Sequence, residues 1–131
     1  MDGVLSTLKV CLSFGIGVLG WFLGGFDTML ITLLVFMLVD YITGILNAIA
    51  NKKLCSSVGF KGLLKKVLII LLVGSINILG IAMEIDGLRY LVISFYLANE
   101  GISILENACK LGVPVPEKIK DVLEQLKEGE K

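Results

Sequence analysis

The sequence contains no histidine, and its 131 residues include only three cysteines, two prolines and one tryptophan. Histidine is the commonest general base and a usual ligand of zinc and haem, so its absence disfavours centres of those kinds. The cysteines, at positions 11, 55 and 109, form no CxxC pair, and an odd number leaves one thiol under any disulfide scheme. We therefore expect reduced, incidental cysteines, no cofactor, no bound metal and no enzyme activity.

Charge is also scarce, and it is balanced. Twelve Lys and Arg offset twelve Asp and Glu, so no net positive field points to nucleic acid as a partner. Hydrophobic residues make up 56% of the chain, and the mean hydropathy is +0.89. A chain this short cannot hide so much apolar surface in one core, which predicts a lipid bilayer as its solvent.

Four apolar segments are candidates for membrane-spanning helices, which need about 20 residues each. They cover residues 4–26, 28–50, 67–83 and 90–108. The second and third are the strongest, whereas the first contains Lys9 and the last contains Glu100. We predict an all-α integral membrane protein with four transmembrane helices within residues 1–112, and three helices as the alternative.

The lysines predict how the segments are oriented. Five lysines and no acidic residue lie in the predicted loop 51–66, and five more lysines follow the fourth segment. The positive-inside rule then places this loop and both termini in the cytoplasm. The loop lysines serve as a topology anchor in this interpretation, and an anionic-lipid site is the alternative. A cleaved signal peptide is disfavoured for the first segment because no A-x-A-like site follows it.

Residues 113–131 are the one part that looks water-soluble. Pro114 and Pro116 break the chain after the last apolar segment, and Pro116 suits the first position of a new helix. An apolar stripe follows at helical spacing, formed by Ile119, Val122, Leu123 and Leu126. We predict a short amphipathic helix that is solvated or packs on its own chain, or else contacts the membrane surface or another subunit.

Small residues form a stripe along the first segment at spacings of four, three and four: Ser13, Gly17, Gly20 and Gly24. The last two form a GxxxG motif. Such faces let helices approach closely in lipid. The stripe mediates either self-association or packing against the other spans of the same chain.

Asp40 and Glu100 each fall near the middle of a predicted span, where a charged side chain costs about 2.5–3.5 kcal/mol on insertion scales. No Lys or Arg is expected deep enough to neutralise either acid. Further polar residues in the spans are Thr43, Asn47, Asn77, Ser94 and Asn99. These groups either line a bundle interior or a water-filled path, or they only hold the helices together.

Three ordered runs resemble one protein family. They are Asp40-Tyr-Ile-Thr-Gly44, then Lys53-Leu-Cys-Ser-Ser-Val-Gly-Phe-Lys-Gly-Leu-Leu-Lys-Lys66, then Asn99-Glu-Gly-Ile-Ser-Ile-Leu-Glu-Asn107 followed by Gly112-Val-Pro-Val-Pro-Glu117. The chain resembles the phage-lysis and toxin-secretion holins of Gram-positive bacteria and their phages over roughly residues 30 to 127. The resemblance marks Asp40, Thr43, Gly44, Lys53, Ser56, Ser57, Gly59, Gly62, Lys65, Lys66, Asn99, Glu100, Ser103, Glu106, Asn107, Pro114 and Pro116.

This resemblance implies a function without catalytic residues. Such proteins accumulate in the bacterial cytoplasmic membrane, form large homo-oligomers and open lesions through which an endolysin or a toxin leaves the cytoplasm. The alternatives are a small cation channel or transporter, which intramembrane acids would suit, and a non-conducting membrane scaffold.

Overall fold

The computed structural model describes residues 1–128, apart from the side chain of Leu126. Within these residues the chain forms five helices and no strand, which confirms the all-α prediction. The helices are α1 (Asp2–Leu23), α2 (Thr28–Ala50), α3 (Ser56–Met83), α4 (Leu88–Lys110) and α5 (Glu117–Glu128).

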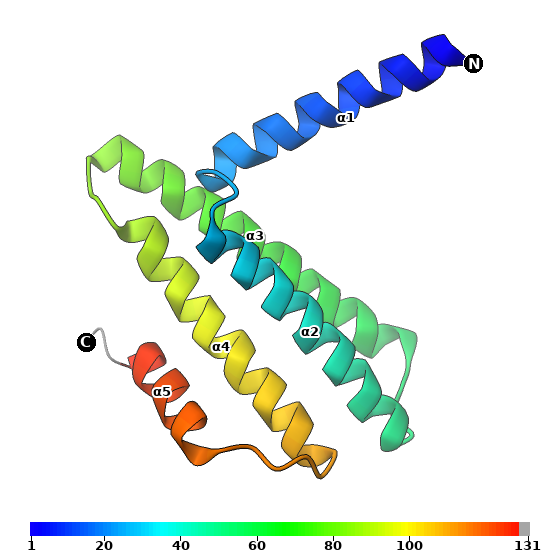
Figure 1. Cartoon of the computed structure of the whole chain (residues 1–131), viewed down its shortest axis with the longest axis vertical. Helices are drawn as coiled ribbons and strands as arrows, with labels where there is room; N and C mark the ends of the chain where they lie inside the picture. The colour runs from blue at the N-terminus through cyan, green and yellow to red at the C-terminus, as the bar shows by residue number, and fades with distance from the viewer. Residues whose placement is uncertain (129–131) are drawn as a thin grey trace.

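Helices α2, α3 and α4 lie side by side and alternate in direction, and α4 contacts both of the others (Figure 1). Helix α1 projects from one end of this bundle and contacts α3 near the α1–α2 turn (Figure 1). Helix α5 folds back along α4. The fold is therefore a three-helix bundle from which α1 projects and against which the short helix α5 packs.

The core is small and lies where the end of α1 meets the bundle. Its fully buried side chains include Leu23 of α1, Leu33 of α2, Val73 of α3 and Ile93 of α4. Most other large apolar residues stay exposed on the outside of the helices. Contiguous exposed apolar surface marks a membrane or protein contact. Among the described residues, α1, α2 and α3 are long and apolar enough to cross a membrane.

The turn between α1 and α2 explains why α1 ends where it does. Gly24 adopts a left-handed conformation (φ 82°), and its N–H donates to the carbonyls of Gly20 and Trp21. Only glycine takes this conformation without a steric penalty. Asp27 then caps α2, because its side chain accepts a hydrogen bond from the N–H of Leu30.

The predicted segments compare unevenly with the observed helices. The second, residues 28–50, coincides with α2, and the first and last overlap α1 and α4. The prediction of a loop over residues 51–66 is wrong, because α3 begins at Ser56 and has 28 residues. No proline interrupts residues 56–66, and lysine is a good helix former, so the helix extends beyond the uncharged stretch that defined the predicted span.

Candidate functional site: a buried charge cluster

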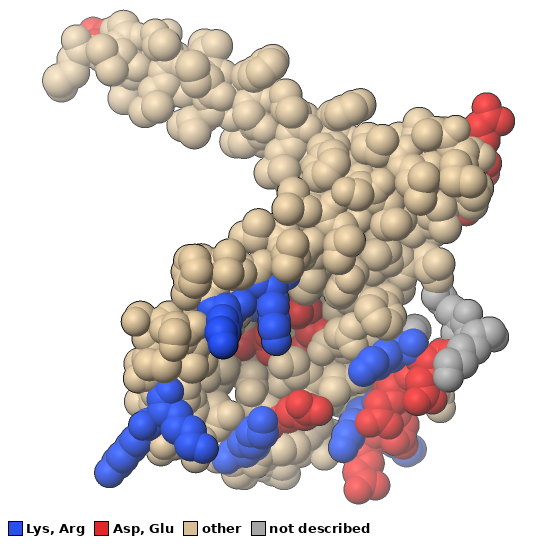
Figure 2. Space-filling view, turned by 180° about the vertical axis from the view of Figure 1, so that it is seen from behind, with Lys and Arg blue, Asp and Glu red and all other residues tan. Residues whose placement is uncertain are grey.

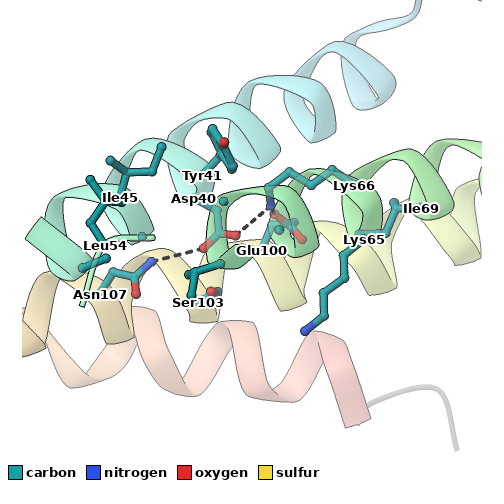
Figure 3. Close-up of a pocket in the computed structure, with 15 residues that line it drawn as sticks. Asp40, Tyr41, Ile45, Leu54, Lys65, Lys66, Ile69, Glu100, Ser103 and Asn107 are labelled. Atoms are coloured by element: carbon teal, nitrogen blue, oxygen red, sulfur yellow. Dashed lines mark hydrogen bonds and ion pairs between the residues drawn. The ribbon is translucent and has the colours of Figure 1, made fainter. Parts of the chain in front are cut away.

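A cluster of three charged side chains joins the three helices of the bundle (Figure 3). Lys66 of α3 places its Nζ 2.7 Å from Oδ2 of Asp40 on α2 and 2.5 Å from Oε2 of Glu100 on α4. The side chains of Lys66, Asp40 and Glu100 are only 12%, 16% and 9% exposed. This arrangement is a buried ion-pair cluster that ties α2, α3 and α4 together.

Two neighbouring polar groups complete the cluster. Asn107 of α4 donates from Nδ2 to Oδ1 of Asp40 at 3.3 Å and to Oγ1 of Thr43 at 3.1 Å. The hydroxyl of Thr43 in turn donates to the carbonyl of Asp40. Both carboxyl oxygens of Asp40 therefore have a partner, as buried charged groups require.

The expectation that no Lys or Arg reaches the two acids is wrong. It rested on placing Lys66 in a loop, whereas Lys66 lies inside α3. Its position along α3 explains the contact: Lys66 precedes the buried residues Ile69, Val73 and Asn77 by three, seven and eleven residues. That spacing places all four residues on one face, while Lys65 lies about 100° away around the helix.

With all three groups ionised, the cluster holds one positive and two negative charges, so it carries a formal charge of −1. Removing one member of a buried pair leaves an uncompensated charge, which costs about 3–5 kcal/mol. Lys66 is the only cation of the three and contacts both acids. The charge balance of the cluster therefore depends on Lys66.

A cavity of about 530 Å³ opens beside the cluster, between α2, α3 and α4 (Figure 3). Its wall includes Tyr41, Ser103 and Lys65 in addition to the charged cluster. Gly59 and Gly62 face Tyr41, because a Cβ at these positions would lie 3.4 and 3.6 Å from the tyrosine side chain. These glycines belong to the sequence run 53–66 that carries the family resemblance, and they give α3 a surface that accommodates Tyr41. In the same region, Gly44 lies opposite Asn107.

The remaining predicted polar residues do not join the cluster. Asn77 is buried and donates to the carbonyl of Phe22 at 3.0 Å, so it fixes the end of α1 to α3. Asn47 accepts from Asn51 within the last turn of α2. Asn99 is half-buried, and Glu106 is exposed. Lys53 is exposed in the α2–α3 connection, and Ser56 and Ser57 form the first turn of α3.

The predicted small-residue stripe is only partly a packing surface within the chain. A Cβ at Gly17 would meet nothing within 4 Å, and Ser13 is exposed. A Cβ at Gly20 would lie 3.0 Å from the ring of Phe26. Gly24 follows the last helical residue of α1 as its left-handed cap, and a Cβ there would lie 2.5 Å from Nε of Arg89, so it packs closely against the bundle.

Arg89 forms a second polar contact that the sequence did not reveal, at the opposite end of the bundle. Its guanidinium donates to the carbonyls of Leu23 and Gly25 at 2.6 and 2.8 Å and makes two bonds to Asp27, the shorter at 2.7 Å. The hydrogen bonds from Arg89 to Asp27 hold the pKa of the Asp27 carboxyl below its ordinary value. Arg89 therefore secures the α1–α2 turn to the start of α4.

The predicted C-terminal helix is present as α5, and Pro114 and Pro116 lie in the connection before it. Leu123 packs on Gly101, since a Cβ added to that glycine would lie 3.1 Å from the leucine side chain. Of the two arrangements left open for this helix, the described residues show packing on its own chain. The predicted apolar stripe also includes Leu126, whose side chain lies outside the part of the chain that the structure describes, as do residues 129–131.

Comparison with known proteins assigns the chain to a family. A relative from Clostridium perfringens, described as an uncharacterised 14.9 kDa protein in the nagH 3′ region, is 42% identical over 96% of this chain and 97% of its own length. A protein of Bacillus phage phi105, described as a probable holin, is 38% identical over 70% of this chain and 68% of its own. No solved structure gives a significant match. Residues 17–128 match the bacteriophage holin family, and the chain belongs to that family.

Proposed function

We propose that the protein acts as a holin: it assembles as a homo-oligomer in the bacterial cytoplasmic membrane and opens lesions that release a cell-wall hydrolase. The family supports this class of function. The structural observation that carries the proposal concerns α1, which is long and apolar enough to cross a membrane although only 6% of the residues in its most apolar stretch are buried. An exposed apolar helix of this length requires lipid around it, and its small residues allow other copies of the chain to pack against it.

The charge distribution supports the proposed orientation. Lysines gather at one end of the bundle, around the α2–α3 connection, whereas Glu84 and Asp86 lie in the turn between α3 and α4 (Figures 1 and 2). An apolar zone separates the two ends (Figure 2). By the positive-inside rule the lysine-rich end faces the cytoplasm, as do the N-terminus and the end of α4 at Lys110. This orientation requires α4 to complete a fourth crossing, although its composition is less apolar than that of α1, α2 and α3.

The cluster of Asp40, Lys66 and Glu100 favours a lesion-forming protein over a selective cation channel. Both acids are directed inward at Lys66 and are mostly buried, so neither presents a free carboxylate to passing ions. We assign the cluster a structural role, in which it holds α2, α3 and α4 together. These three helices then pack as one unit against other copies of the chain. The released protein is an endolysin or alternatively a toxin, and we expect no direct contact between it and this chain.

Conditional expression in a bacterium tests the proposal. The strain also produces a muralytic enzyme that has no export signal, and a potential-sensitive dye reports on the membrane. A holin causes abrupt depolarisation followed by lysis, whereas either protein alone leaves the cells unlysed. Depolarisation without lysis would indicate an ion channel or transporter, and the absence of both effects would indicate a scaffold.

A further inference from the structure

Helix α5 lies against the middle of α4 rather than beyond its end. Leu123 of α5 covers Gly101, which is near the centre of the 23-residue α4, and the ring of Phe36 on α2 also approaches this glycine. A Cβ at Gly101 would lie 3.1 Å from Leu123 and 3.4 Å from Phe36. The contact is therefore formed by bare backbone on α4 and a leucine on α5.

The far end of α5 extends further along α4. Lys127 and Glu128 line a cavity of about 450 Å³ together with Leu88, Leu91 and Phe95, which belong to the first half of α4. Figure 1 shows α5 running back along α4 in this direction. If α4 crosses the membrane, α5 consequently lies at the depth of the hydrocarbon core.

The composition of α5 is incompatible with lipid at that depth. Seven of its twelve residues are charged: Glu117, Lys118, Lys120, Asp121, Glu124, Lys127 and Glu128. All seven are exposed, and no ion pair within residues 1–128 joins them to the bundle. In Figure 2 they form the mixed red and blue group beside the grey tail. Charged side chains in hydrocarbon are strongly disfavoured, so the outer side of docked α5 must face water.

We propose that α5, docked on α4, lines the aqueous lumen of the assembled oligomer. The inference rests on the proposed function, because a lumen exists only if copies of the chain assemble. Its charged face contacts the water that fills the lesion, and Leu123 attaches it to Gly101. The cluster of Asp40, Lys66 and Glu100 stays inside each subunit, so the polar lining comes from α5 rather than from the intramembrane acids.

A disulfide lock between the two helices tests the inference. In a chain whose three native cysteines are replaced by serine, Gly101→Cys and Leu123→Cys place thiols at the observed contact. The purified protein is reconstituted into phosphatidylethanolamine–phosphatidylglycerol vesicles that contain a fluorescent protein, then oxidised. We expect the disulfide to form in the membrane and the locked chain to release the cargo as fully as the reduced chain, with each single-cysteine variant as the control.

A second measurement reports the surroundings of the charged face. A fluorophore on Glu124→Cys, in the same cysteine-free chain, is expected to be quenched by aqueous iodide and not by a lipid-attached quencher. The same label on Val18→Cys of α1, which is half exposed and apolar, is the matched control and is expected to show the opposite pattern.

The outcomes separate this inference from the proposed function. If the wild-type and reduced chains release cargo but the locked chain does not, α5 must leave α4 and the inference is wrong while the holin function stands. Failure of the disulfide to form in vesicles, or quenching at position 124 by lipid alone, also overturns the inference. If the wild-type chain itself releases nothing, the proposed function fails, and the lumen with it.

Discussion

At the scale of single residues, Lys66 is the position on which the buried cluster depends. Its amine contacts both acids, whereas within residues 1–128 each acid contacts only this one cation. Neutralising one acid removes the excess negative charge and leaves one complete ion pair. Neutralising the lysine instead leaves two carboxylates buried beside each other. The three substitutions therefore differ in effect although they alter the same cluster.

We expect Lys66→Met to destabilise the folded chain by about 3–5 kcal/mol, the usual effect of breaking a buried ion pair. Glu100→Gln and Asp40→Asn are expected to cost clearly less, because Lys66 retains one partner in each case. Thermal unfolding of the purified variants in detergent measures the order. The exposed Lys65→Met is the matched control and should unfold like the wild type. Equal losses at all three cluster positions would contradict the assigned role of Lys66.

The contact between Arg89 and Asp27 predicts a dependence of stability on acid pH. The folded state lowers the pKa of Asp27, mainly through its hydrogen bonds to Arg89. The contribution of this contact is therefore complete above the unfolded pKa, at about pH 4, and is lost as the pH falls through the lower folded value. Asp27→Asn should be less stable than the wild type at pH 7, and the difference should shrink on acidification. A constant difference between pH 7 and pH 3 would exclude this linkage.

At the scale of helices, α1 carries the assembly surface in this account. Gly17 belongs to the predicted stripe, and a side chain there would meet nothing within 4 Å of the same chain. We expect Gly17→Ile to leave the fold unchanged and to reduce chemical cross-linking between copies in membranes. Gly15→Ile provides the matched control, since Gly15 lies on another face of α1 and is equally open. Equal cross-linking of both variants would mean that the stripe is not the contact between copies.

The end of α1 requires glycine at position 24, and the structure explains why. Gly24 has a positive φ, and a Cβ there would lie 2.5 Å from Nε of Arg89 and 2.6 Å from Oδ1 of Asn77. We expect Gly24→Ala to destabilise the attachment of α1 by at least about 1–3 kcal/mol, the range for backbone strain alone. Increased proteolysis at the α1–α2 turn, with α2–α4 still protected, measures this effect. Gly25→Ala also has a positive φ but open space, so it isolates the strain from the clash.

The sequence predicted the helices better than it predicted where they meet. The hydropathy prediction of a span over 28–50 matches α2, because apolar residues predominate between its N-cap Asp27 and its C-cap Asn51. It misplaced the start of α3, since counting uncharged residues treats Lys65 and Lys66 as a boundary although the helix continues through them. It also found Asp40 and Glu100 as unusual residues. It could not find the contact of Arg89 with Asp27, which joins residues 62 positions apart across two turns.

For the whole molecule, the proposed orientation determines which parts of the chain face each side of the membrane. The native Cys55 lies in the lysine-rich α2–α3 connection, and Asp86 lies in the α3–α4 turn. In intact cells, before any lesion opens, a membrane-impermeant maleimide should label Asp86→Cys and should not label Cys55. The comparison uses chains in which each is the single cysteine. Labelling of Cys55 in sealed cells would reverse the proposed orientation.

Release of molecules of graded size by the purified chain distinguishes a holin from an ion channel. Vesicles loaded together with a small dye and a folded fluorescent protein receive the wild-type chain, and the release of each is followed separately. We predict that both escape, because copies of the chain surround an opening wide enough for an enzyme. Escape of ions or dye with complete retention of the protein would contradict it.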